Sequence, residues 1–310
     1  MDHHHHHDHS HVHGNVGHTH APDTFGFAFA IGVVLNTAIV VAELVFGYAA
    51  NSLALIADAA HNFSDVISLL LAWGAAWLAL RRPTEQHTYG YRRASILAAL
   101  INAGLLLLAV GGIAAEAIGR FQHPSPVVGQ TVIYVAILGI VVNGATALLF
   151  MRGRHGDLNI RGAYLHMVAD AGVSFGVVVA ALLIMWTGWL WIDPAVSLGI
   201  AAVVLVSGWG LAKDSVNLAM DGVPKGIDLA VVESYLRERE GVIEVHDLHI
   251  WAMSTNETAL TAHLVRPGGL DDAFLNHVCD ELSHRFNIAH ATLQIEAGSG
   301  ICRLAPAEVV

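Results

Sequence analysis

The sequence predicts a membrane protein of six transmembrane helices followed by a small α+β domain. Three observations predict this fold. The chain of 310 residues is 55% hydrophobic, and 13% of it is charged, where soluble domains average about 25%. Its mean hydropathy is +0.55. Apolar stretches long enough to cross a bilayer, about 20 helical residues each, recur until the pattern changes near the C-terminus.

Six apolar stretches give the expected spans, at residues 25–48, 53–80, 94–119, 128–151, 161–187 and 190–213. The turn GYAANS separates the first two spans, and Pro124 with Pro126 interrupts the chain between the third and the fourth. Asp193-Pro194 opens the sixth span, because proline is tolerated in a first helical turn. Residues 23–215 are therefore expected to form a six-helix transmembrane domain.

The distribution of arginine predicts the orientation of these spans, since basic residues collect in cytoplasmic loops. The opposite side of the bundle has only Arg120. The second-to-third and fourth-to-fifth connections are flanked by Arg81, Arg82, Arg92, Arg93, Arg152, Arg154 and Arg161. Both termini are therefore expected in the cytoplasm.

From residue 222 the pattern becomes that of a small soluble domain. It predicts a helix around 227–239, a strand at EVHDLHIWAM, a turn at STNE, a strand at TALTAHLV, a helix around 271–286 and a strand at ATLQIEA. The order α-β-β-α-β suits a three-stranded sheet with helices on one face, of metallochaperone or ferredoxin-like type. We expect residues 222–310 to form this domain on the cytoplasmic side.

The first 22 residues are rich in histidine. MDHHHHHDHSHVHGNVGHTH has neither the basic start nor the apolar run of a signal peptide. A purification tag is the alternative for residues 3 to 7, but the scattered histidines that follow favour a native tail: His9, His11, His13, His18 and His20. We expect a disordered cytoplasmic segment that binds divalent metal loosely through imidazole.

Charge and cysteine content exclude two classes of protein. The formal net charge is −11, and the acidic excess is greatest after Gly222, so no nucleic-acid partner is expected. Cys279 and Cys302 form at most one bridge, which excludes a disulfide framework.

Ionisable side chains inside two spans are the most informative pattern. The second span carries His61 and Asp65, and the fifth carries His166 and Asp170; each pair is four residues apart and shares one helix face. Two imidazoles and two carboxylates match the ligands of a tetrahedral zinc site. An ionised group at the bilayer centre costs about 2.5–3.5 kcal/mol, so four such groups need the compensation that a divalent cation provides.

Other polar residues in the spans have less definite roles. Asp58 precedes His61 by three residues, and we interpret it as a partner that supports His61 or lines the way in, with a structural hydrogen bond as an equal alternative. Glu43, Asn36 and Asn143 lie in other spans as helix-contact or pathway residues of unknown role.

The motifs in combination resemble the cation diffusion facilitator family, close to its bacterial zinc, cobalt and cadmium resistance members. They are HNFSD in the second span, HMVAD in the fifth, the segment VHDLHIW and the closing LQIE. The resemblance implies that the matching residues bind zinc within the membrane: His61, Asp65, His166 and Asp170. It also implies a homodimeric exporter that exchanges metal for protons, located in a bacterial inner membrane, with no enzymatic activity and no organic cofactor.

The resemblance also bears on metal selectivity and metal capture. Some family members have Asp at the position of His61, and this difference is associated with cadmium, so His61 favours zinc, with cadmium and cobalt as further candidate ions. In the loop HTYGYRRAS, His87 is a weak candidate ligand, because Tyr91 stands where some relatives have a second His. The connection between the fourth and fifth spans, MRGRHGDLNIR, has only one histidine, His155. The N-terminal tail is therefore the segment that we expect to capture metal.

The resemblance implies a second metal site in the C-terminal domain, with His246, His263 and Glu296 as ligands. Weaker candidates are His249, His290 and Cys302. If the first two strands of this domain form a hairpin whose turn is centred on Asn256, His249 would lie opposite His263. His246 would then lie one period further along its strand. Zinc there is expected to draw two protomers together as a regulatory ligand.

The expected function is secondary active efflux of divalent cations, zinc first, from the cytoplasm in exchange for protons. Zinc requires neutral imidazole and ionised carboxylate, so metal and protons compete for the same side chains. Two alternatives stay open. One is a non-transporting, membrane-anchored zinc sensor; the other is a membrane hydrolase, which four protein ligands disfavour because its zinc needs an open coordination position.

Overall fold

The computed structural model describes residues 25–151, 158–268, 271–298, 300, 302 and 304, without the side chains of residues 25–32, 149–150 and 158–163. Six long helices come first: α1 (Phe25–Ala49), α2 (Leu53–Ala79), α3 (Ala94–Gln122), α4 (Gly129–Met151), α5 (Leu158–Thr187) and α6 (Ile192–Ala219). The rest is α7 (Leu229–Arg237), β1 (Glu244–Ala252), β2 (Thr258–Val265), α8 (Asp272–Phe286) and β3 (Ile288–Glu296). The histidine-rich tail, Arg152, Arg154, His155 and the Arg161 side chain lie outside this description.

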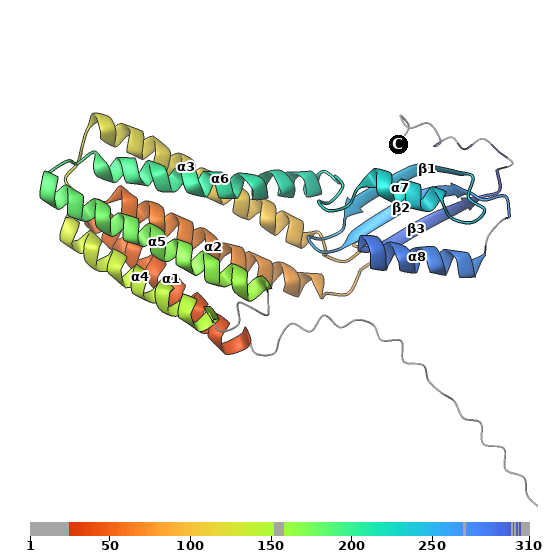
Figure 1. The fold of residues 1–310 in the computed structure, drawn as a ribbon, viewed down its shortest axis with the longest axis horizontal. Helices are drawn as coiled ribbons and strands as arrows, with labels where there is room; N and C mark the ends of the chain where they lie inside the picture. Colours follow the sequence, from red (N-terminus) through yellow and green to blue (C-terminus); the bar gives the residue numbers. More distant parts are fainter. Residues whose placement is uncertain are drawn as a thin grey trace, which may run out of the picture.

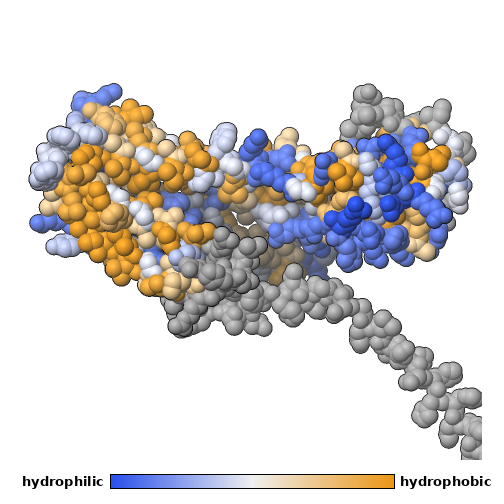
Figure 2. All heavy atoms as spheres, in the orientation of Figure 1, coloured by the Kyte–Doolittle hydropathy of each residue, from blue (hydrophilic) through white to orange (hydrophobic). Residues whose placement is uncertain are grey.

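The long helices form one bundle, with the α+β part at one end (Figure 1). By length and composition, five helices are able to cross a membrane: α2, α3, α5, α6 and the Gly129–Leu148 part of α4. The part of α1 whose side chains are described, Val33–Ala49, is apolar but shorter, so the sixth span stays a prediction. Figure 2 shows mostly hydrophobic side chains over the visible face of the bundle and mostly hydrophilic ones over the α+β part.

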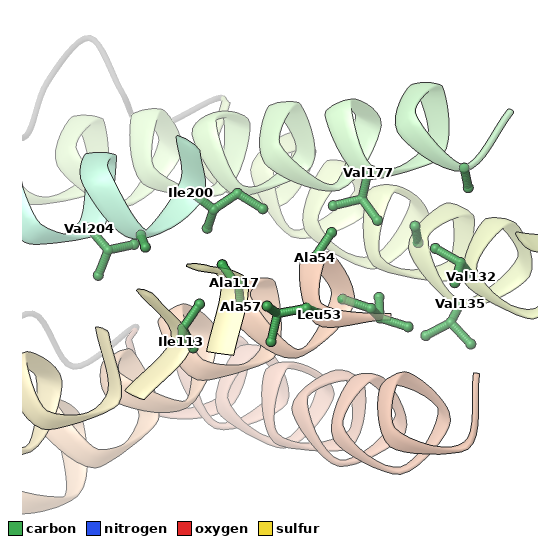
Figure 3. Packing of buried hydrophobic residues seen from close by; sticks show 14 of the residues in the cluster. Leu53, Ala54, Ala57, Ile113, Ala117, Val132, Val135, Val177, Ile200 and Val204 are labelled. Atoms are coloured by element: carbon green, nitrogen blue, oxygen red, sulfur yellow. The ribbon is translucent and has the colours of Figure 1, made fainter. Parts of the chain in front are cut away.

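A cluster of small and β-branched side chains joins five of the long helices. Buried residues of α2, α3, α4, α5 and α6 form one continuous hydrophobic core. Small side chains let helix backbones approach closely, which is how membrane helices pack without a hydrophobic driving force. Figure 3 shows this core close up, with labels on Leu53, Ala54, Ala57, Ile113, Ala117, Val132, Val135, Val177, Ile200 and Val204.

Asp193 ties the ends of three helices together. Its carboxylate accepts hydrogen bonds from the Ser52 hydroxyl at 2.7 Å and from the backbone N–H groups of Leu53 at 2.8 Å and Ala54 at 3.2 Å. These N–H groups have no partner within α2, because they belong to its first turn. Arg120, near the end of α3, lies 3.6 Å from the same carboxylate. A residue of α6 therefore caps α2 and holds the end of α3.

The α+β part has the predicted three-stranded sheet, in the order β1-β2-β3. β1 and β2 are antiparallel, and β2 and β3 are parallel. Leu260 and Leu264 of β2 are fully buried in one hydrophobic core with Leu236 of α7 and Leu282 of α8. Both helices therefore cover the same face of the sheet, as predicted, and leave the other face open.

The predicted register of the hairpin is wrong. Ala252 pairs with Thr258, so the turn centres on Thr255, closed by a 2.9 Å hydrogen bond from Met253 N to Glu257 O. The register then shifts between His246 and His249, where Asp247 has a φ of 51°. This bulge adds a residue that an alternating pattern does not count. His246 consequently lies opposite His263, and His249 lies opposite Thr261.

Candidate metal centre

Four side chains from α2 and α5 come together inside the bundle. His166 Nε2 lies 3.1 Å from Asp65 Oδ2 and 3.6 Å from Asp170 Oδ2. His61 Nε2 lies 3.5 Å from Asp170 Oδ1, and the rings of His61 and His166 have centroids 6.1 Å apart. The structure thus brings together the whole quartet that the two four-residue spacings predict.

The spacing of the quartet suits a small divalent cation. Ligands placed about 2.0–2.2 Å from a tetrahedral zinc ion lie roughly 3.3–3.6 Å from one another. Donor atoms of Asp65, His166 and Asp170 all lie within 4.8 Å of one another, and His61 joins this set through Asp170. The Asp170 side chain is 1% exposed, and neither of its oxygens accepts a hydrogen bond. A buried carboxylate in this condition needs a positive partner, which a metal ion supplies.

Asp58 of α2 forms a hydrogen bond with α5. It is fully buried, and its Oδ2 accepts a 2.9 Å hydrogen bond from the Ser174 hydroxyl of α5. Its Oδ1 accepts none. The geometry of the described side chains therefore favours a hydrogen-bonded link between α2 and α5 over a bond to His61.

A second cluster of donors lies on the open face of the sheet. His246 Nε2 lies 3.5 Å from Glu296 Oε2, and His263 Nδ1 lies 3.2 Å from Glu296 Oε1. Cys302 Sγ is 3.5 Å from His263 Nδ1. Donor atoms of these four residues lie within 4.8 Å of one another. The three candidates implied by the resemblance are thus neighbours, and Cys302 joins them.

Asp247 is the neighbour that sequence reasoning missed. The bulge turns its carboxylate toward two histidines, with Oδ2 3.3 Å from His263 Nε2 and Oδ1 2.9 Å from His249 Nε2. The signal was present in VHDLHIW, where an acid stands between two histidines. Burial raises the pKa of Glu296, but hydrogen bonds from Gln294 and Cys302 and the nearby His246 and His263 outweigh it and lower that pKa below its ordinary value.

Two weaker candidates belong to neither donor group found in the described residues. The His87 ring stacks on Tyr91 with centroids 4.7 Å apart. The His290 ring meets Tyr89 edge to face at 5.6 Å. Both histidines lie where the α2–α3 loop approaches the sheet, so their geometry is that of a packing interface.

The same loop is joined to the β1–β2 turn by polar contacts. Arg92 Nη1 lies 2.5 Å from Glu257 Oε2, and the Thr255 N–H donates to the Ser95 hydroxyl at 3.1 Å. Arg93 pairs with Asp221, which follows α6. The hydrophilic end of the molecule is therefore connected directly to the α2–α3 loop and the start of α3, which also contact the segment after α6.

Comparison with known proteins finds matches along nearly the whole chain. The family model "Cation efflux transmembrane domain" matches residues 29–218, and "Cation efflux protein, cytoplasmic domain" matches residues 224–298. The "Cadmium, cobalt and zinc/H(+)-K(+) antiporter" of Bacillus subtilis is 38% identical over 287 residues, which cover 91% of this chain and 92% of the relative. The "Zinc transporter ZitB" of Escherichia coli is 38% identical over 271 residues, 86% of each chain.

A solved structure resembles the C-terminal part. The metal-bound C-terminal domain of the CzcD transporter from Cuprividus metallidurans is 36% identical, covers 23% of this chain and 99% of its own, and has a TM-score of 0.21. The family assignment rests instead on the first family model, which spans more than half of the chain, and on the full-length relatives. The chain is a multi-pass membrane protein and belongs to the cation efflux proteins, the cation diffusion facilitator family that its motifs resemble.

Proposed function

We propose that the protein exports divalent metal cations, zinc first among them, from the cytoplasm in exchange for protons. The observation that carries the proposal is the convergence of two histidines and two aspartates from α2 and α5 inside the bundle. The relatives that match over most of their length are named as zinc transporters and as zinc, cadmium and cobalt antiporters, which supports it.

Competition between metal and protons at the quartet provides the coupling. Zinc binds neutral imidazole and ionised carboxylate, so each proton that the quartet takes up opposes the metal. Histidine ordinarily titrates with a pKa of about 6.5, which places this competition near physiological pH. Protons from an acidic outer face displace zinc there, and their release to the cytoplasm restores the site. The two faces are reached in two conformations, which ligands select by their different affinities.

The proposed topology has six spans and both termini in the cytoplasm. α1 has 25 residues, so at 1.5 Å per residue it reaches about 37 Å, more than the roughly 30 Å of a hydrocarbon core. Arg92, which belongs to an arginine-rich connection, contacts Glu257 of the α+β part. This contact supports a location of the α+β part on the side that the positive-inside rule assigns to the cytoplasm, and it is consistent with domains at 23–215 and 222–310.

We assign the open face of the sheet to a regulatory zinc site in a homodimer. The face presents His246, His263, Glu296 and Cys302, with Asp247 beside them. Zinc bound there would neutralise acidic charge and favour one arrangement of two protomers. The salt bridge from Arg92 to Glu257 then carries the change to the ends of the transmembrane helices, which is what coupling between two sites requires.

Transport in reconstituted vesicles tests the proposal. Proteoliposomes containing the wild-type protein are expected to take up zinc when a pH gradient is imposed. The double variant His61→Ala, Asp170→Ala removes both partners of one pair and is expected to abolish uptake. His277→Ala, at an exposed position on α8, is the matched control and is expected to transport like the wild type. Uptake that persists in the double variant would refute export through this quartet.

The donors on the sheet favour one alternative, a membrane-anchored zinc sensor that does not transport. In that case the four clustered donors of the α+β part would be the functional site. The vesicle assay separates the two functions, because a sensor binds zinc at the sheet and gives no flux. A wild-type protein without zinc flux would favour the sensor.

A further inference from the structure

A second polar group lies inside the bundle beside the quartet. It consists of Glu43 of α1, Asp58 and Asn62 of α2, and Ser174 of α5, and we call it the buried acid cluster. All four residues are 0% exposed. Asn62 Nδ2 donates to Glu43 Oε2 at 3.2 Å, and the Ser174 hydroxyl donates to Asp58 Oδ2 at 2.9 Å. Three helices thus contribute to a compact set that includes two carboxyl groups.

The buried acid cluster has fewer hydrogen-bond donors than acceptors. Glu43 Oε1, Asp58 Oδ1 and Asn62 Oδ1 are all acceptors, all buried, and all without a partner. Asn143, one turn beyond Gly139 on α4, has a buried Nδ2 donor that is also without a partner. A buried polar atom without a partner is costly, and an ionised carboxylate without one is far more so. A proton on a carboxyl group relieves both deficits, since it removes the charge and adds a donor.

Among the described residues, no Lys, Arg or His side chain lies within ion-pair distance of Glu43 or Asp58. The charged groups that act on Glu43 are Asp58 of α2 and Asp170 of α5, while α4 has no Asp, Glu, His, Lys or Arg in its sequence. Asp58 also faces His61 and Asp170. The cluster is therefore coupled electrostatically to the quartet through Asp170.

The backbone of Gly139 of α4 lies close to the unpartnered oxygen of Glu43. A Cβ atom at this position would lie 3.1 Å from Glu43 Oε1 and 3.1 Å from Ser174 Oγ. The unpartnered Glu43 oxygen and the Ser174 hydroxyl therefore both border Gly139, and Ser174 also bonds to Asp58.

We propose that Glu43, with Asp58 as its neighbour, binds a transported proton at a site separate from the four candidate metal ligands. This inference rests on the proposed function and adds to it where a counter-ion is held. A proton from the outer side neutralises the Glu43 carboxylate in the metal-free state. When zinc binds at the quartet, its positive charge near Asp170 disfavours this proton, which leaves to the cytoplasm. The exchange moves one proton and breaks no other bond.

Proton release on zinc binding tests the inference in the full-length protein. Calorimetric zinc titrations in buffers of different ionisation enthalpy give the number of protons released per zinc. Glu43→Gln keeps the size of the side chain and is expected to retain zinc binding while releasing one proton fewer than the wild type. Glu43→Asp, which keeps an acid, is expected to restore that proton. Protons released at the sheet are the same in every variant and cancel in the difference.

Glu116→Gln is the matched control, because Glu116 is also an acid in a membrane helix but is exposed beside Arg120. It is expected to release as many protons as the wild type. An unchanged proton count in Glu43→Gln would overturn the inference and leave the proposed function intact, whereas absence of zinc flux in the wild type would overturn the proposed function.

Infrared difference spectra of the wild type give a second readout that needs no variant to fold. A carboxylic-acid C=O band, shifted by D₂O, is expected before zinc is added and is expected to disappear when zinc binds. Absence of such a band would contradict the inference.

Discussion

His246 and His263 face each other across β1 and β2, with ring centroids 5.3 Å apart. They do so because the bulge at Asp247 moves His246 by one position relative to the partner strand. Without the bulge, the period-two alternation would put Asp247 opposite His263 and turn His246 to the helix-covered face. The backbone irregularity is therefore what assembles the donors on the open face of the sheet.

Asp247→Gly tests the contribution of the bulge carboxylate. Glycine adopts the positive φ of this position without strain, so the bulge and the strand pairing are expected to remain. Loss of the carboxylate beside His263 is expected to weaken zinc binding at the sheet by about 10–100-fold. Calorimetry in a His61→Ala, Asp170→Ala background removes the contribution of the quartet. Unchanged affinity would remove Asp247 from the account of the sheet site, and His277→Ala serves as the control.

Glu296 is expected to give the α+β part an acid-sensitive stability. Its pKa is held below the ordinary value in the folded state, so it stabilises the fold above that value and loses this contribution as pH falls through the folded pKa. Thermal unfolding in the presence of a chelator, at neutral pH and across the acid range, measures the effect. Glu296→Gln is expected to remove part of the acid dependence. An identical pH profile in wild type and variant would contradict the prediction.

Asp193→Ala is expected to destabilise the bundle strongly. The substitution uncaps the first turn of α2 and leaves the largely buried Arg120 without this carboxylate. Breaking a buried ion pair costs about 3–5 kcal/mol. Glu116→Gln removes the exposed partner of the same arginine, and a surface pair of this kind contributes about 0.2–1 kcal/mol. A thermal-shift measurement that gives both variants the same small effect would contradict the capping role.

The contact between Arg92 and Glu257 is expected to couple the sheet to the transmembrane helices and to contribute little to stability. Both side chains are partly exposed, so Arg92→Glu is expected to change stability by about 0.2–1 kcal/mol. The same variant is expected to abolish the response of transport to zinc at the sheet. The exchanged pair Arg92→Glu, Glu257→Arg restores opposite charges and is expected to restore the response. Equal responses in the single variant, the exchanged pair and the wild type would show that this contact carries no coupling.

The long helices could be predicted from sequence because each is set by an extended apolar run. The expected second span, 53–80, is α2 at Leu53–Ala79, and the expected fourth, 128–151, is α4 at Gly129–Met151. The quartet was predictable for a related reason, since two residues four apart on one helix share a face whatever the tertiary structure. The matched spacing also predicted that the second and fifth spans meet, and the structure adds the distances between their side chains.

The remaining features depend on backbone irregularity or on packing across helices. A bulge changes which residues oppose one another without changing composition, so the position of Asp247 beside His263 left no periodic signal. Glu43 and Ser174 are far apart in sequence and meet at Gly139 only because α1, α4 and α5 pack together. Asp193 was expected at the start of a helix. Its capping of α2 could not be predicted, because Asp193 and the first turn of α2 are far apart in the sequence.

The dependence of zinc movement on a proton gradient tests the central claim most directly. Zinc uptake is measured in proteoliposomes with an acidic interior, before and after an ionophore collapses the gradient, for the wild type and for Asp65→Asn and His166→Ala. These two residues share the 3.1 Å contact of the quartet. The account predicts gradient-dependent accumulation of zinc in the wild type and none in either variant. Zinc uptake of equal rate with and without the gradient, or in both variants, would contradict it.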